Sequence, residues 1–304
     1  MRDFLQARAR VGAVVHLVLQ WGAIALALLS ATPVRADALV DGGKLVLTQG
    51  ISSIEGASGG GLASWATIAG METNRGIGLS GHVTGIALPD YGWQSHGVAI
   101  GIKDRLELSY ARQNFDTRRV GAALGLGRGF RFNQDIYAAK LKLAGDLVYG
   151  PALLPQISIG VQHKRSLDPA IVKAVGAGSA SGTDFTVSAT KLFLSKSVLA
   201  DATVRLTKAN QFGLLGFGGP RRSARSVQFE GSVAYMLTPR LVVGAEYRTR
   251  PDNLRFAREN DAYDGFVAWA VKRNVTVTAA FADVGSVATV KGQRGALLSL
   301  QLAI

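Results

Sequence analysis

A serine and a histidine at strand-like spacing are the first candidates for chemistry in this chain of 304 residues. Ser80 and His82 are two positions apart in an alternating segment, so both side chains would project from one face of a strand. Such a pair could serve a membrane hydrolase, but the sequence offers no third group to orient the histidine. The G-x-S-x-G match at residues 56–60 lies in a glycine-rich segment and lacks the strand-to-helix elbow that this motif requires. We assign no catalytic residue.

Metal and cofactor sites are not indicated by the remaining reactive residues. Beyond the N-terminal segment the histidines are His82, His96 and His163, which fall in three separate segments without a neighbour at metal-ligand spacing. Cysteine is absent, so a cysteine metal site or a disulfide framework is not available. The glycine run at residues 125–129 resembles part of a dinucleotide fingerprint but has no βαβ context. The sequence therefore predicts no metal and no cofactor.

The N-terminus has the organisation of a secretory signal. Arg2, Arg8 and Arg10 precede an apolar run over 11–30, and Val34-Arg35-Ala36 fits a small-residue cleavage site. The run is long for a signal, so an uncleaved anchor is the alternative. We expect cleavage after residue 36, which leaves a single β-domain over 37–304. Because the removed segment holds four arginines and one aspartate, the formal net charge falls from +13 to +10.

Alternation of apolar and polar residues is the main structural signal after residue 60. A period of two indicates strands with one apolar and one polar face, and segments of about ten residues suit strands that cross a bilayer. No later segment approaches the ~18 apolar residues of a spanning helix. The pattern predicts fourteen strands: 43–49, 65–72, 77–86, 94–102, 105–114, 135–148, 156–164, 183–194, 198–207, 226–237, 240–249, 262–271, 275–283 and 295–304.

The connections alternate between tight turns and long loops. The long ones, 115–134, 165–182, 208–225 and 250–261, fall on every second gap and so lie at one end of the strands. This asymmetry is typical of outer-membrane barrels, which have short periplasmic turns and long extracellular loops. The sequence thus predicts an all-β fold, a single antiparallel transmembrane β-barrel. Twelve strands is the alternative to fourteen, if the first hairpin folds into the lumen, and a soluble β-sandwich is the alternative fold.

The polar faces of the predicted strands carry charges that would line the lumen. The candidate lumen residues are Glu107, Lys140, Lys142, Asp201, Arg205, Glu230, Glu246, Arg248 and Asp264. With Lys164 the set contains five basic and five acidic side chains, which predicts a lumen whose charges compensate one another.

Arginines cluster in the predicted long loops. The candidates for contact with lipopolysaccharide phosphates are Arg118, Arg119, Arg221, Arg222, Arg255 and Arg258. Guanidinium groups bind phosphate in a bidentate manner, which favours this contact. The alternative is that these arginines are solvated surface charges without a specific ligand. The expected partners are outer-membrane lipid and lipopolysaccharide, together with the outer-membrane assembly machinery. Export and the barrel pattern argue against nucleic acid as a partner, despite the positive net charge.

Several motifs together carry a family resemblance. They include Gly43-Lys44-Leu45-Val46-Leu47-Thr48, Leu106-Glu107-Leu108-Ser109-Tyr110-Ala111-Arg112-Gln113 and Leu124-Gly125-Leu126-Gly127-Arg128-Gly129-Phe130. In these the chain resembles a proteobacterial family of outer-membrane β-barrel proteins that is known only as a domain of unknown function. The resemblance implies a barrel in the cell outer membrane and supplies no activity, cofactor or catalytic residue. Ile304 departs from the aromatic residue that commonly ends such barrels.

Three functional hypotheses follow. The first is a porin-like channel or passive pore, with the lumen charges biasing its selectivity. The second is a lipid-acting hydrolase that uses Ser80 and His82. The third is a structural barrel whose lumen is plugged, for which the Gly- and Ser-rich segment 51–64 is the candidate plug.

Overall fold

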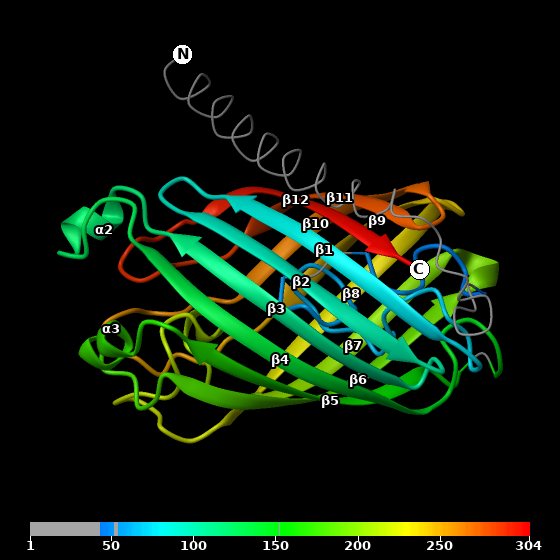
Figure 1. The fold of residues 1–304 in the computed structure, drawn as a ribbon, viewed down its shortest axis with the longest axis horizontal. Helices are drawn as coiled ribbons and strands as arrows, with labels where there is room; N and C mark the ends of the chain where they lie inside the picture. The colour runs from blue at the N-terminus through cyan, green and yellow to red at the C-terminus, as the bar shows by residue number, and fades with distance from the viewer. Residues whose placement is uncertain (1–42, 52–53, 152) are drawn as a thin grey trace, which may run out of the picture.

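The computed structural model describes residues 43–51, 54–151 and 153–304, which form one closed antiparallel β-barrel (Figure 1). The predicted signal segment 1–36 lies outside these residues. Twelve strands close the barrel, and each pairs with its neighbours in the sequence. They are β1 (Ile77–Ala87), β2 (Gly92–Ile102), β3 (Leu106–Asp116), β4 (Arg131–Ala144), β5 (Gln156–Ser166), β6 (Ser181–Phe193), β7 (Val198–Thr207), β8 (Ser226–Thr238), β9 (Leu241–Arg248), β10 (Ala262–Lys272), β11 (Val275–Asp283) and β12 (Arg294–Ala303).

The first and last strands seal the barrel. β1 pairs with β12 from Ser80 opposite Ala303 to Ala87 opposite Ala296. Ile304 extends this seam, because its N–H donates to the Leu79 carbonyl at 2.8 Å and its own carbonyl accepts the Leu79 N–H at 2.9 Å. A closed sheet leaves no row of unpaired backbone groups, which is the condition for strands that are surrounded by lipid.

The predicted alternation separates an apolar outer surface from a polar interior. On β8 the exposed side chains include Val233 and Tyr235, while Glu230 and Ser232 on the opposite face are buried inside. β10 shows the same pattern, with Trp269 outside and Asp264 inside. Large apolar side chains therefore form a belt around the barrel, as expected where the surrounding medium is hydrocarbon.

The two ends of the barrel differ. One end, which we call the long-loop end, carries connections 117–130, 167–180, 208–225, 249–261 and 284–293, and the tight turn 88–91. These connections hold α2 (Val120–Ala123), α3 (Pro169–Ala174) and η2 (Gln211–Gly213). The other end has tight turns, one of them over η1 (Leu194–Lys196), except for an eleven-residue connection at 145–155 that the sequence pattern did not predict.

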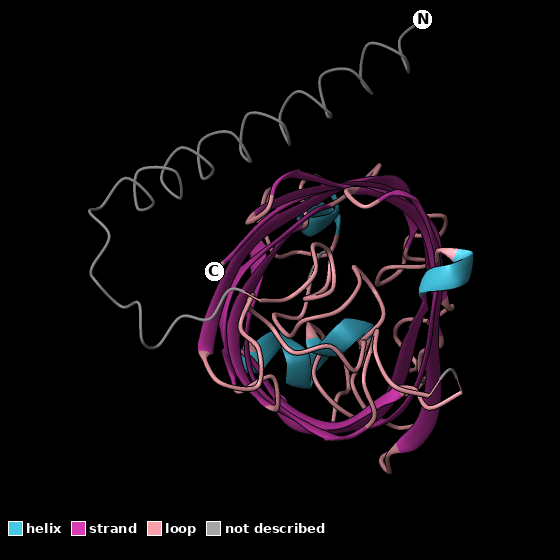
Figure 2. Ribbon diagram, turned by 90° about the vertical axis from the view of Figure 1, so that its right-hand side faces the viewer, coloured by secondary structure: helices cyan, strands magenta, loops and turns pink. Residues whose placement is uncertain are grey.

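Two predicted strands, 43–49 and 65–72, are wrong. Neither segment joins the sheet, so the barrel has the twelve strands of the alternative count. Residues 47–49 and 65–72 are buried, whereas Gly43 and Leu45 are exposed. The view along the barrel axis shows loops inside the ring of strands (Figure 2). No helix in the described part of the chain is both long enough and apolar enough to cross a membrane.

Candidate functional site: the lumen and its plug

The N-terminal part of the described chain fills the lumen. We call residues 43–51 and 54–72 the plug; nearly every residue from Leu47 to Glu72 within it is buried. Glycines allow this compact path, since Gly50 and Gly56 have φ values of 95° and 92° that other residues rarely adopt. A buried segment outside any sheet must satisfy its backbone polar groups elsewhere. In this barrel the side chains of the wall satisfy many of them.

Glu107 and Lys140 hold one part of the plug from β3 and β4. The Glu107 carboxylate accepts the Ser58 N–H at 3.0 Å and the Ala69 N–H at 2.8 Å. The Lys140 ammonium donates to the Ser58 carbonyl at 2.7 Å and to the Thr67 carbonyl at 2.9 Å. The two wall residues lie 3.6 Å apart and are almost fully buried. Glu107 thus accepts hydrogen bonds from N–H groups of the plug, and Lys140 donates hydrogen bonds to carbonyls of the same plug segment.

A second set of wall side chains holds residues 62–66 from the opposite side. Glu246 on β9 accepts the Leu62 N–H at 2.6 Å, and Arg248 donates to the Leu62 carbonyl at 3.1 Å. Glu230 on β8 accepts the Ser64 N–H at 2.8 Å, while Thr203 on β7 donates to the Ser64 carbonyl at 2.6 Å. These bonds tie the plug to three neighbouring strands.

Glu55 of the plug sits among three cations of the wall. Its carboxylate lies 2.5 Å from Lys164 Nζ, 3.0 Å from Arg248 Nη2 and 3.2 Å from Arg205 Nη2. Asp184 contacts Lys164 and Arg205, and Glu230 contacts Arg205 and Arg248. The six side chains form a closed network of three acids and three bases, each at most 7% exposed.

The charge balance of this network depends on the plug. Without Glu55, two carboxylates of the wall would face three buried cations. Removing one partner from a buried ionic network is strongly destabilising because it leaves an uncompensated charge. The wall is therefore electrostatically complete only with the plug in place.

All nine candidate lumen residues lie on the inner side of the barrel, but they do not line an open channel. Lys142 is near the end with tight turns, where it contacts Asp104 at 2.5 Å. Asp201 accepts a hydrogen bond from Thr190 at 2.6 Å, and the backbone of Gly61 approaches Asp264. The other six contact the plug directly. Sequence analysis missed Glu55, Asp184 and Lys44, of which Lys44 pairs with Asp104 at 2.9 Å.

Among the described residues, no hydrogen bond joins the hydrolase candidates Ser80 and His82. His82 is buried on the inner face of β1 and its Nε2 lies 3.3 Å from Ser95 Oγ. His96 and His163 lie on the outer face of their strands, the latter 3.0 Å from Thr183 Oγ1. Within the part of the chain that the structure describes, no three histidine or acidic side chains are grouped so that they could hold a metal ion.

The arginines predicted to contact phosphate all lie at the long-loop end. Arg119, Arg222, Arg255 and Arg258 are exposed. The remaining two have protein partners. Arg118 donates to the Leu88 carbonyl at 2.9 Å, and Arg221 forms an ion pair with Asp252.

A buried acid–base pair lies beneath these loops. Arg250 Nη1 is 3.8 Å from the Glu259 carboxylate, which also accepts the Gln211 N–H at 2.8 Å. Burial raises the pKa of Glu259 to about 7, against the opposing effect of Arg250. Near neutral pH the Glu259 charge therefore compensates Arg250 only in part.

The fold and the site together define a class: a transmembrane β-barrel with an apolar outer belt and a polar lumen that its own chain occupies. The chain belongs to the family described as "Protein of unknown function (DUF3034)", whose model matches residues 48–301. No curated protein matches the sequence.

Three solved structures with a similar chain path share little sequence identity with this chain. The KdgM porin is 8% identical, with a TM-score of 0.48, over 73% of this chain and 98% of that one. Omp33 of Acinetobacter baumannii is 8% identical, with a TM-score of 0.41, over 79% and 100%. The outer membrane phospholipase (OMPLA) of Salmonella typhi is 9% identical, with a TM-score of 0.42, over 74% and 90%.

Proposed function

We propose that the protein is a porin-like barrel of the cell outer membrane whose resting state is closed by its own plug. The network around Glu55 carries the proposal, because it joins the plug to β5, β7 and β9 by ion pairs that complete the charge balance of the wall. Solutes can then pass only when the plug moves. The apolar belt places the strands in a bilayer, and the long loops face the outside, as in barrels of this class.

Conductance in planar bilayers tests this function. The full-length mature protein should be closed for most of the recording, because the plug fills the lumen. A variant without residues 37–72 should give discrete ohmic steps, provided that it still migrates as a folded barrel on an unheated detergent gel. Glu55→Ala should open intermittently, and Asp116→Ala, which changes an acid away from the plug, should remain closed. Steady conductance of the unmodified protein, or silence of both folded plug variants, would contradict the proposal.

The arginines of the long loops favour lipopolysaccharide as a partner of this barrel. Four of the six are exposed without a side-chain ion pair among the described residues, and Arg221 pairs only with Asp252 of a loop; these five lie in three loops of the long-loop end. Phosphate groups of lipopolysaccharide match the guanidinium donors. The proposed contact is electrostatic, so exposed pairs should weaken as salt rises.

Replacing these arginines should remove bound lipopolysaccharide without unfolding the barrel. The variant changes Arg119, Arg221, Arg222, Arg255 and Arg258 to Gln and keeps Arg118, which bonds the Leu88 carbonyl. The ratio of copurified lipopolysaccharide to protein should fall several-fold, since each lost contact is charge-assisted. A control with Lys196, Arg240 and Lys272 at the other end changed to Gln should keep its lipid. An equal ratio of lipopolysaccharide to protein in both variants would show that the loop arginines are solvated charges that do not bind the lipid.

A further inference from the structure

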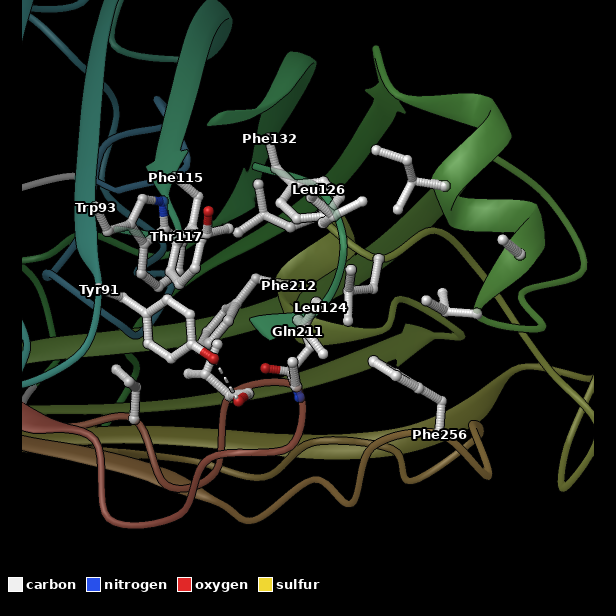
Figure 3. A pocket seen from close by; sticks show the side chains of 18 of the residues that line it. Tyr91, Trp93, Phe115, Thr117, Leu124, Leu126, Phe132, Gln211, Phe212 and Phe256 are labelled. Carbon is white, nitrogen blue, oxygen red and sulfur yellow. Dashed lines mark hydrogen bonds between the residues drawn. The ribbon is translucent and has the colours of Figure 1, made fainter. Parts of the chain in front are cut away.

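An apolar cavity lies beneath the loops of the long-loop end, outside the plug contacts described above. Its volume is about 200 Å³. Aromatic side chains from strand ends and loops surround it, among them Tyr91, Trp93, Phe115 and Phe212 (Figure 3). The rings are fixed against one another, with centroids 5.0 Å apart for Tyr91 and Phe115 and 5.1 Å apart for Trp93 and Phe212. Leu126 and Ile171 from the loops close the opposite side.

The size of this cavity is suited to a small ring. Protein interiors seldom leave voids much larger than a water molecule. An apolar cavity of roughly 150 Å³ in another protein stays dry and binds benzene. A rigid aromatic wall around an even larger space therefore provides a site for a molecule about the size of one aromatic ring.

Two residues that line the cavity carry buried hydrogen-bond donors that are not used. Gln211 is 3% exposed, and its Nε2 makes no hydrogen bond within the described residues. Arg250 is 8% exposed; its Nε and Nη2 donate to the carbonyls of Asn260 and Val284, but Nη1 makes no hydrogen bond. Both residues line the cavity. Buried donors without acceptors are rare because they cost folding free energy, so these two groups are candidates for hydrogen bonds to a ligand.

The charge around the cavity favours an anionic partner. The nearest acid to Arg250 Nη1 is Glu259, at 3.8 Å, and its raised pKa leaves the guanidinium partly uncompensated. Two exposed arginines are close in sequence to the lining residues: Arg119 precedes α2, and Arg255 precedes Phe256 of the cavity wall. Positive charges of this kind attract anions.

We propose that this cavity binds a small apolar carboxylic acid, whose ring or branched chain lies among Trp93, Phe115 and Phe212. Its carboxylate accepts hydrogen bonds from Gln211 Nε2 and Arg250 Nη1 after these two side chains rotate toward the cavity. The cavity is formed by the loops and strand ends, so binding does not require the plug to move. Binding of the acid can therefore be tested independently of the closed-channel function.

Three probes with the same ring separate the parts of this proposal. Titration of the purified full-length protein by calorimetry should show saturable binding of benzoate. Methyl benzoate, a neutral acceptor, should bind more weakly, and toluene, which has no acceptor, should bind most weakly. Gln211→Leu keeps the size of the side chain but removes the donor, so the affinity for benzoate should fall roughly tenfold while that for toluene does not fall. Equal loss for all three probes would overturn the assignment of the carboxylate to Gln211.

A pair of variants on α3 tests the location. Ala174 is exposed and lines the cavity, whereas Lys173 beside it is exposed and does not. Ala174→Trp should fill the entrance and abolish binding of benzoate, and Lys173→Trp should leave it unchanged. No saturable binding of benzoate to the unmodified protein, or the same affinity in both tryptophan variants, would overturn the proposal.

Discussion

Glu55→Ala should lower the free energy of unfolding by about 3–5 kcal/mol, the cost typical of breaking a buried ion pair by removing one partner. The mutation leaves Lys164, Arg205 and Arg248 with the carboxylates of Asp184 and Glu230 only. All of these groups are almost fully buried, so water cannot replace the lost carboxylate without opening the plug. Chemical unfolding of the protein in detergent, monitored by tryptophan fluorescence, measures the loss.

A charge-balanced variant separates the charge from the packing. Glu55→Gln keeps the shape of the side chain and should still be strongly destabilised. Adding Lys164→Gln removes one cation along with the anion, and the double variant should recover part of the loss if uncompensated charge is the cause. A loss below 1 kcal/mol for Glu55→Ala would show that the plug is not held by this network.

Leu108→Arg should cost about 2–4 kcal/mol, as expected for an arginine on the lipid face near the middle of a bilayer. Leu108 is the third residue of β3 and lies between Leu106 and Tyr110 on the outer face. It pairs with Ile100 and Ala139, and 45% of it is exposed on the outer surface. The guanidinium would have to enter hydrocarbon or distort the bilayer around it. Unfolding of the protein reconstituted in lipid vesicles measures the effect.

Leu153 provides the matched control for this substitution. It is 92% exposed, but it lies in the 145–155 connection beyond the strands. Leu153→Arg makes the same chemical change in water and should be nearly neutral, within about 0.5 kcal/mol. Similar damage from both substitutions would mean that the outer surface of β3 does not face lipid.

The barrel could be predicted because the residue pattern of each strand reflects the environment of its two faces. Each strand meets lipid on one face and the lumen on the other, so apolar and polar residues alternate with the period of the pleat. The segments 43–49 and 65–72 carry a similar pattern for another reason. Leu47 and Trp65 pack into an internal apolar cluster with Leu199 and Val242 of the wall. Local alternation does not distinguish a strand in a sheet from a segment of turns and bends whose backbone groups are satisfied by side chains.

The candidate site was only partly accessible from the sequence, for a related reason. The alternation pattern places Arg205, Glu230 and Arg248 on the inner face of the barrel. It does not predict which residues they contact there. Glu55 lies 109, 150 and 193 residues from Lys164, Arg205 and Arg248 along the chain. One signal was present: Glu55 is the single charged residue in the Gly- and Ser-rich segment 51–64. The apolar cavity at the long-loop end is formed largely by loops. Loop packing has no sequence period, so the sequence did not predict this cavity.

A disulfide between the plug and the wall tests the central claim, that the plug occupies the lumen of the native protein. The chain has no cysteine, so Ser64→Cys/Thr203→Cys introduces one pair without background. The Thr203 hydroxyl donates to the Ser64 carbonyl at 2.6 Å, which places the two residues side by side. After mild oxidation of intact cells, both thiols should resist a maleimide that adds mass, and should react only after reduction and denaturation. The control pair Ser64→Cys/Leu108→Cys, with Leu108 on the outer surface, should form no such bond. Free, reactive thiols at positions 64 and 203 in the folded barrel would contradict the account.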